Sequence, residues 1–321
     1  MSKFSCYYCP KSEEKLVVSE DISCLKGQTI SYPIVNSIPR FVSSANYSND
    51  FGLQWNKFSK TQLDSTTGKS ITEDRLRRCL LGNLELIKDK TILEAGSGAG
   101  RFTEILLKYQ AKVHSFDLSN AVEANMKNNG YKGRIDIAQA DISNMPFKQN
   151  NYDYVICLGV IQHTPSPENS IADLWRMVKP GGHLIFDHYR FKWRHILPPP
   201  IGIAGPLYRR IILLFDTSLR MYLIRKIVDF WYPLHWQFRK SKLMQRLLRR
   251  ISPVHFYYGK LPIYSREKLY DWAFLDTHDS LTDHYKHYRS IKQIEATIKL
   301  LGCKSYKLHI SSHGIEAFCT K

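Results

Sequence analysis

Five short apolar runs are spaced through the middle of the chain. They span residues 91–93, 111–116, 135–140, 152–157 and 183–187. Between them, segments such as 101–109 place apolar residues three or four positions apart, which is the spacing of an amphipathic helix. Strands that alternate with helices predict a parallel sheet with helices packed on its faces, so we expect an α/β fold.

Alternating glycines follow the first run, in the stretch LEAGSGAGRF (93–102). They lie between a strand and a helix, where a missing Cβ lets the backbone approach a ligand closely. A P-loop would need Gly-Lys-Ser/Thr after its spacer, and the dinucleotide fingerprint would need glycine where Arg101 stands. With Glu94 two residues ahead of Gly96, the spacing suits a ligand that carries a cation rather than a pyrophosphate. An ordinary glycine-rich turn remains the alternative on this stretch alone.

Acidic residues follow the next two runs. Asp117 ends the second run, roughly 20 residues after the glycines, where a doubly wound sheet places an acid that holds a ribose diol. Asp141 follows the third run, and the fourth run leads through Leu158 to His163. The carboxyl ends of these strands are therefore expected to form one binding edge.

Five segments in register resemble class I S-adenosylmethionine-dependent methyltransferases of the UbiE-like, methyltransferase type 11 group. They are LEAGSGAGRF, SFDLS, QADISNMPF, YDYVICLGVIQHT and VKPGG. The resemblance covers residues 90–190 and implies a Rossmann-like, doubly wound sheet of seven strands with an antiparallel last strand. It also implies S-adenosyl-L-methionine as the cofactor.

The resemblance assigns the cofactor contacts to the strand ends. These residues are Glu94, Gly96, Ser97, Gly98, Gly100, Arg101, Asp117, Leu118, Asp141, Ile142 and Leu158. A subgroup of the family is similar in residues 54–64, where a QW…F…QLD segment roofs the cofactor, which adds Trp55 and Gln62. A helix that merely buries aromatic side chains on the sheet is the other interpretation of that segment.

Methyl transfer to a hydroxyl or an acidic carbon needs a base that removes the proton of the acceptor. The candidates are His163 after the fourth run, His188 after the fifth, and Asp276 and Asp279 in the DTHD cluster. Each one alone is more commonly a structural hydrogen-bonding group, but several in one cleft favour catalysis. We rank His163 first, His188 second and the two aspartates third. The transfer itself requires no metal.

The first 45 residues carry Cys6-x-x-Cys9 and Cys24, but Gly27 stands where a zinc ribbon would place its fourth cysteine. Structural zinc is usually held by four Cys or His ligands. We therefore expect a degenerate, ribbon-like segment that packs on the catalytic core without metal, and a zinc-binding ribbon is the alternative. The chain has seven cysteines, an odd number that does not form a complete set of disulfide pairs. Reduced thiols in the cytoplasm suit this number better.

Much of the net charge of +17 lies between Arg190 and Lys260, where 15 Lys and Arg residues face two acids. This stretch holds basic amphipathic segments, and 242–251 has one apolar face. That face comprises Leu243, Met244, Leu247, Leu248 and Ile251, and the interfacial aromatics are Trp193, Trp231, Tyr232 and Trp236. A lid with a solvated basic face, attachment to an anionic membrane or lipid-linked substrate, and nucleic-acid contact all remain open. Aliphatic stripes do not stack bases, which disfavours the last.

The domains expected are a ribbon-like segment (1–45), a cofactor-binding core (46–190), a helical cap (191–264) inserted after the fifth strand, and a segment that completes the core (265–321). We expect a methyltransferase acting on an O, N or C atom of a small-molecule, glycan or lipid-linked acceptor. An RNA methyltransferase, a non-catalytic cofactor-binding module and a dehydrogenase are the alternatives. No apolar run reaches the roughly 18 residues of a membrane span, so we expect a cytoplasmic protein, with peripheral membrane attachment as an option.

Overall fold

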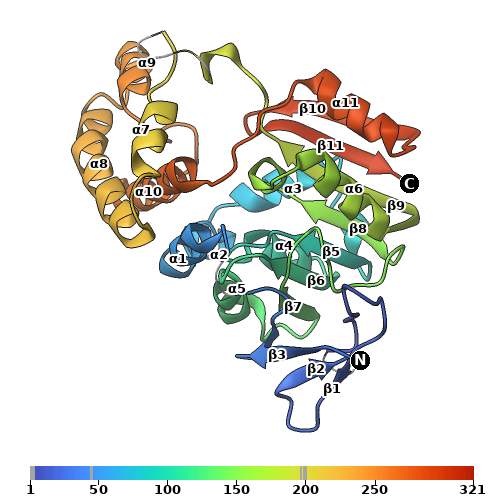
Figure 1. Ribbon diagram of the computed structural model, residues 1–321. Coiled ribbons are helices and arrows are strands. Elements are labelled where there is room, and N and C mark those ends of the chain that lie inside the picture. Colours follow the sequence, from blue (N-terminus) through green and yellow to red (C-terminus); the bar gives the residue numbers. More distant parts are fainter. Residues whose placement is uncertain (1–3, 44–45, 196, 198–200) are drawn as a thin grey trace.

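The computed structural model describes residues 4–43, 46–195, 197 and 201–321. A seven-stranded sheet forms its centre, in the order β10-β11-β9-β8-β5-β6-β7 (Figure 1). The strands are β5 (Thr91–Ala95), β6 (Lys112–Asp117), β7 (Ile135–Gln139), β8 (Tyr152–Cys157), β9 (Val178–His188), β10 (Ser305–Ser311) and β11 (Gly314–Thr320). The doubly wound α/β fold expected from the sequence is therefore confirmed.

Strands β5 to β9 run parallel, whereas β11 pairs antiparallel with both β9 and β10. The strand order reverses between β5 and β8, and in open α/β sheets such a reversal opens a crevice at the carboxyl ends of the strands. This crevice is where the glycine turn after β5 lies.

Helices cover both faces of the sheet. They are α3 (Ile71–Cys79), α4 (Arg101–Lys108), α5 (Val122–Asn129), α6 (Pro167–Met177) and α11 (Ile291–Leu300), with short turns η1 (Glu85–Ile87) and η2 (Ile161–His163). Leu76 of α3 and Leu106 of α4 share one apolar cluster with Ile92 of β5. Leu174 of α6 and Ile298 of α11 belong to the cluster on the other face.

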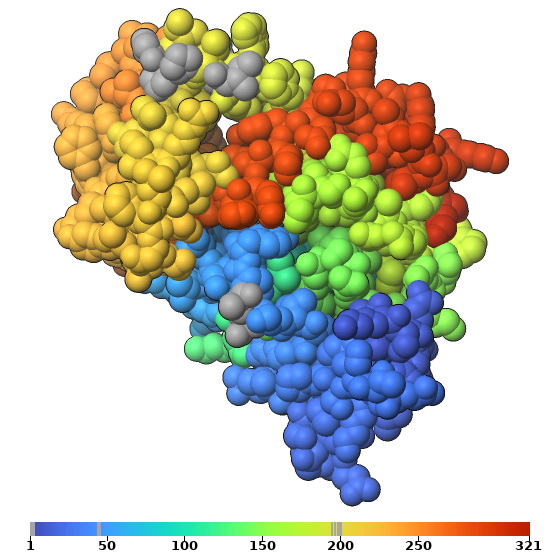
Figure 2. Space-filling model, viewed as in Figure 1, coloured from blue at the N-terminus to red at the C-terminus, as the bar shows by residue number. Residues whose placement is uncertain are grey.

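The N-terminal residues form a small sheet of their own, which Figure 2 shows in blue at one end of the molecule. Its strands are β1 (Val17–Val18), β2 (Cys24–Lys26), β3 (Ser31–Val35) and β4 (Ile38–Pro39). Tyr7 and Leu25 are fully buried in the same cluster as Phe116 and Phe147 of the main domain. The N-terminal unit, residues 4–43, thus shares the main core.

The cap lies at the opposite end, in yellow and orange (Figures 1 and 2). It follows β9 and the turn η3 (Trp193–His195), and its helices are α7 (Gly205–Ile212), α8 (Thr217–Gln237), α9 (Lys242–Ile251) and α10 (Arg266–Thr282). Val228, Tyr232, Phe256 and Phe274 form a separate apolar core there. The boundary at residue 264 divides this unit, because α10 packs with α7 and α8 rather than with the sheet.

One expectation about the cap surface needs correction. Among the expected interfacial aromatics, Tyr232 is buried and Trp231 and Trp236 pack against the cap core, so only Trp193 is exposed. The apolar face of α9 is mostly open to solvent, since only Leu248 of that face is buried. Leu243, Leu247 and Ile251 have exposed fractions of 66%, 49% and 47%.

Helix α1 (Asn49–Lys57), which precedes the short α2 (Asp64–Thr67), joins the core to the cap. Arg220 of α8 donates from Nη1 to Asp50 Oδ2 at 2.6 Å, and His278 Nδ1 of α10 lies 2.6 Å from Gln54 Oε1. Within the described residues, no helix is both long and apolar enough to cross a bilayer.

Candidate active site

A cavity of about 860 Å³ lies where the carboxyl ends of the parallel strands meet α1 and the cap. Small-molecule sites usually measure roughly 300–1,000 Å³, so this volume has room for a donor and an acceptor side by side. Core residues such as Gly96 line one part of it, and cap residues such as Arg209 line the other.

The glycine turn forms the floor of the cavity. Gly96 and Gly98 have φ angles of +73° and +53°, which residues other than glycine rarely adopt. A Cβ on Gly98 would lie 3.2 Å from Cε2 of Trp55, and a Cβ on Gly96 would collide with Val160. Trp55 therefore covers the turn, as the family resemblance implied.

Asp117 is held at the end of β6 beside this turn. Its Oδ2 accepts from the amide of Gly98 at 2.9 Å, and its Oδ1 accepts from the amide of Ser119 at 2.8 Å. Oδ1 also accepts from the hydroxyl of Ser119 at 2.7 Å, so Oδ2 is the oxygen with capacity for a further hydrogen bond. The cavity is also lined by Ser97, Leu118, Asp141, Ile142 and Leu158. The hydroxyl of Ser97 is buried without a hydrogen-bond partner in the described chain. These cavity side chains suit a ligand that combines ribose hydroxyls with the apolar faces of a base.

Two predicted cofactor contacts do not line the cavity. Glu94 is buried under the turn, where its Oε2 accepts from Ser115 Oγ at 3.0 Å and from Thr103 Oγ1. Gly100 lies against α5, and a Cβ there would collide with the side chains of Asn125 and Asn129. Both residues shape the turn from beneath, so the expectation of direct contact is wrong for them.

Arg101 and Gln62 both line the cavity, in a chain of hydrogen bonds. Arg101 Nη1 donates to Gln62 Oε1, and Gln62 Nε2 donates to Asp276 Oδ1 at 3.0 Å. Tyr257 Oη donates to the other oxygen of Asp276. Both carboxylate oxygens of Asp276 are thus engaged, so this residue positions its neighbours rather than serving as a free base. Burial lowers the pKa of Arg101 to about 10, and the neighbouring charge of Arg75 acts in the same direction.

The neighbours Asp187 and His188 point to opposite faces of β9, as successive residues of a strand do. Asp187 lines the cavity, accepts from the amide of Gly159 at 2.6 Å and forms a buried ion pair with Arg75. His188 is fully buried, lies outside the cavity lining and has its Nδ1 3.0 Å from the carbonyl oxygen of Tyr189. Burial lowers the pKa of His188 to about 4. A direct catalytic role for His188 is inconsistent with this position.

His163 lines the cavity at the end of η2. Its Nδ1 lies 3.2 Å from the carbonyl oxygen of Tyr285 and 3.4 Å from Asp283 Oδ2. Both neighbours are acceptors, so Nδ1 carries the proton and Nε2 is the basic nitrogen. Asp283 is fully buried and also pairs with Arg209 and Lys286.

Asp279 lies one helical turn before Asp283 and also lines the cavity. Its carboxylate has no hydrogen-bond partner among the described residues. Burial raises the pKa of Asp279 to about 6, the charges of Asp283 and Asp276 act in the same direction, and His163 opposes them. Asp279 is therefore suited to proton transfer near neutral pH, and His163 presents an oriented ring nitrogen to the same cavity.

The acceptor side of the cavity is strongly basic. Nine Lys and Arg side chains line the whole cavity against five carboxylates. Those on the acceptor side form what we call the basic rim, which comprises Arg190, Lys192, Arg209, Arg210, Arg249, Lys260 and Lys286. Such a rim favours an anionic ligand.

Sequence reasoning missed Arg75, Tyr257 and Asp283. No local pattern marks them, because each reaches the site from an element that only the tertiary fold brings near. For Asp283, the presence of Lys286 three residues later was a weak signal of an ion pair.

Comparison with known proteins agrees with the domain expected from the sequence. Residues 93–186 match the family model described as a methyltransferase domain. The ubiquinone biosynthesis O-methyltransferase of Alkalilimnicola ehrlichii is 26% identical over 218 residues, which cover 67% of this chain and 78% of that protein. Its counterpart from Coxiella burnetii (strain Dugway 5J108-111) is 29% identical over 118 residues, or 36% of this chain and 50% of that protein.

Among solved structures, a candidate S-adenosyl-L-methionine-dependent methyltransferase of Methanococcus maripaludis matches 87% of this chain and 96% of its own, with 16% identity and a TM-score of 0.46. The matched domain covers β5 to β9, the strands whose ends form the glycine turn and the acidic edge. Residues 93–186 of this chain therefore form a methyltransferase domain, as the resemblance to S-adenosylmethionine-dependent methyltransferases implied.

Proposed function

We propose that this methyltransferase methylates a hydroxyl oxygen of an anionic acceptor that also has an apolar part. The observation that carries the proposal is the oriented His163, which shares one cavity with the donor floor and the basic rim. The similar proteins from Alkalilimnicola and Coxiella are named as O-methyltransferases of ubiquinone biosynthesis, which supports an oxygen acceptor.

On the donor side, Asp117 would hold the ribose hydroxyls, and Leu118, Ile142 and Leu158 would enclose the base. S-adenosylmethionine supplies a methyl group activated by a sulfonium. Trp55 covers the glycine turn, so it would exclude water from the donor. Holding two reactants in line can lower the activation free energy by about 7–11 kcal/mol.

On the acceptor side, His163 Nε2 would take the hydroxyl proton as the oxygen attacks. Asp283 fixes the orientation of the ring, and the ionised Asp279 would stabilise the imidazolium that forms. Positioned proton transfer of this kind contributes about 10²–10⁴-fold in rate. The basic rim would hold a carboxylate or phosphate of the acceptor away from the reacting oxygen.

The cap surface supports attachment to an anionic membrane. Leu207, Ile211 and Leu214 form an exposed stripe on and just after α7, and α9 carries the exposed Leu243, Leu247 and Ile251. Arg246 and Arg250 flank the α9 stripe and are exposed. Apolar stripes flanked by cations bind anionic lipid surfaces, and each cation near the surface adds about 1 kcal/mol.

The test is methyl transfer from isotopically labelled S-adenosylmethionine to hydroxylated aromatic acceptors, supplied as matched pairs with and without a carboxylate or phosphate. We expect an O-methylated product from the anionic member of a pair, identified by mass spectrometry. Equal transfer to both members would contradict the role of the basic rim. Transfer to nitrogen or carbon alone would contradict the hydroxyl acceptor.

A further inference from the structure

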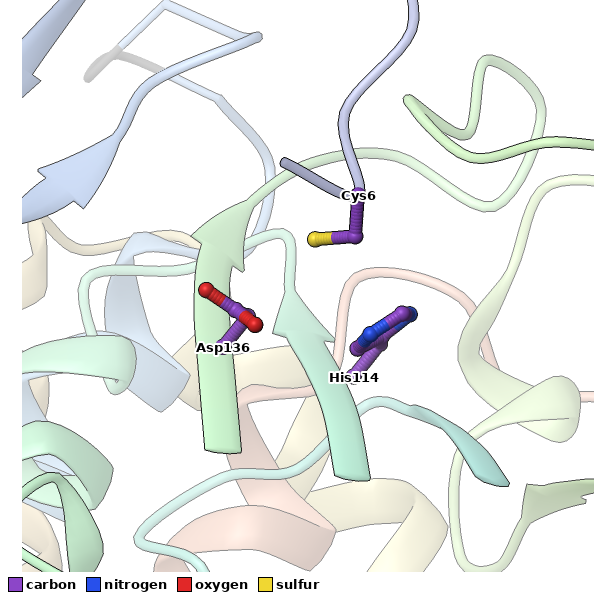
Figure 3. Close-up of side chains that lie close together, drawn as sticks. All are labelled: Cys6, His114 and Asp136. Atoms are coloured by element: carbon purple, nitrogen blue, oxygen red, sulfur yellow. The ribbon is translucent and has the colours of Figure 1, made fainter. Parts of the chain in front are cut away.

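Cys6, His114 and Asp136 come together on the side of the sheet covered by the N-terminal unit (Figure 3). The sulfur of Cys6, a ring nitrogen of His114 and a carboxylate oxygen of Asp136 all lie within 4.8 Å of one another. None of the three residues lines the cavity, so they are not part of the methyl-transfer site.

The fold fixes all three positions. His114 and Asp136 are direct partners in the pairing of β6 with β7, so their separation is set by the sheet. The residues that directly follow Cys6 are bound to the main domain. Tyr7 forms an antiparallel β-bridge with Phe147, and the amide of Tyr8 donates to the carbonyl of Pro146 at 2.9 Å.

The three side chains are a thiol, an imidazole and a carboxylate, which are the groups that bind zinc. Tetrahedral zinc, with bonds of about 2.0–2.3 Å, places its ligand atoms roughly 3.3–3.8 Å apart. Small side-chain rotations would bring this cluster to that separation.

The surroundings of His114 also suit a metal ligand. Its Nδ1 lies 2.8 Å from Tyr152 Oη, and its ring stacks on Phe147 with centroids 5.8 Å apart. A fixed hydrogen-bond partner on one ring nitrogen is the usual arrangement around a metal-bound histidine, because it sets the orientation of the ring.

The cluster differs from the ribbon-type set that the zinc-binding alternative would require. Cys9 points elsewhere, with its sulfur 3.4 Å from Tyr32 Oη. Among the described residues, the metal-ligating side chains that lie together are those of Cys6, His114 and Asp136, and neither Cys9 nor Cys24 joins them.

We propose that Cys6, His114 and Asp136 bind one Zn²⁺ ion, with a water molecule in the fourth position. The ion would join the start of the N-terminal unit to the two strands that it covers. Its role would be structural and separate from methyl transfer.

The first measurement is the metal content of the purified full-length protein after dialysis against zinc and then against metal-free buffer. We expect one zinc per chain in the wild type, and less than a tenth of that in Cys6→Ser and in the nearly isosteric Asp136→Asn. Cys24→Ser is the matched control, since it removes a cysteine of the same unit from outside the cluster, and it should keep its zinc.

The second measurement is titration of the folded wild type with Co²⁺, which reports a cysteine ligand by a thiolate-to-cobalt absorption band. This readout does not depend on any variant folding. A wild type without zinc, or a bound cobalt without the thiolate band, would overturn the proposal. It would also fail if Cys9→Ser and Cys24→Ser lost zinc while Asp136→Asn kept it, since the metal would then belong to a ribbon-type set.

Discussion

The Nδ1 of His163 lies 3.4 Å from Oδ2 of Asp283, although His163 belongs to the core before β9 and Asp283 directly follows α10 of the cap. The cap therefore completes the reaction site by supplying the carboxylate that orients the histidine. The same carboxylate is held by Arg209 of α7 and by Lys286, so cap packing and base orientation depend on each other.

Replacing His163 by alanine should lower kcat by about 10²–10⁴-fold, because it removes the oriented ring nitrogen that we propose as the base. Binding of S-adenosylhomocysteine, measured by calorimetry, should stay close to the wild-type affinity. His309→Ala removes an exposed histidine on β10 and is the matched control. Equal losses of turnover and cofactor affinity in His163→Ala would instead indicate a structural role.

The pKa of Asp279, raised to about 6, predicts a pH dependence. The carboxylate is protonated below this value and ionised above it, and only the ionised form stabilises an imidazolium. We therefore expect kcat/KM to rise as the pH increases through about 6, since this parameter reports groups of the free enzyme. In Asp279→Asn the activity should be lower and this limb of the profile should disappear. An unchanged limb in the variant would assign the titration to another group.

Asp117→Ala should weaken binding of S-adenosylhomocysteine by about 1–3 kcal/mol, the usual cost of losing a hydrogen bond to a charged group. Part of the loss would come from the turn itself, because Asp117 also accepts from the amide of Gly98. Isothermal calorimetry gives the affinity. Glu94→Gln is the comparison: it alters a residue beneath the turn and should affect affinity less. An unchanged affinity in Asp117→Ala would place the ribose elsewhere.

Arg75→Met should lower the free energy of unfolding by about 3–5 kcal/mol, because it leaves the Asp187 carboxylate buried without its partner. The side chains of this ion pair are only 8% and 3% exposed. Denaturant unfolding measures the change. Arg176→Met removes an ion pair whose arginine is 60% exposed, and it should cost less than about 1 kcal/mol. Similar losses of unfolding free energy in the two variants would show that burial does not make the Arg75–Asp187 pair more important for stability.

The cap should bind anionic vesicles at low salt and release them as the salt concentration rises, because screening weakens charge attraction. Arg246→Glu with Arg250→Glu should abolish sedimentation with the vesicles, and so should Leu243→Ser with Leu247→Ser. Lys304→Glu with Lys307→Glu changes the net charge equally at an exposed site on the core and should bind as the wild type does. Binding to RNA in a gel, without vesicle binding, would favour nucleic acid as the partner.

The central sheet was predictable from sequence because its parallel strands are rich in buried apolar residues and alternate with segments of helical spacing. The predicted run 152–157 has the same bounds as β8, and the other parallel strands differ mainly at their ends. The glycine turn and Asp117 were predictable for a related reason: their spacing follows from the geometry of one strand, one turn and one helix.

The acceptor side could not be predicted in the same way. His188 was ranked above Asp279, although alternation along a strand allows only one of the neighbours Asp187 and His188 to face the cavity. The end of the cap was misjudged because α10 resembles an ordinary core helix in sequence, and only packing against α7 and α8 assigns it to the cap.

Helix α1 covers the donor turn with Trp55 and is tied to the cap through Asp50 and Gln54. Any movement of α1 that admits the donor therefore also pulls on the elements that enclose the acceptor. We therefore expect an order of addition in which the donor binds first, beneath α1, and the acceptor binds afterwards, beneath the cap.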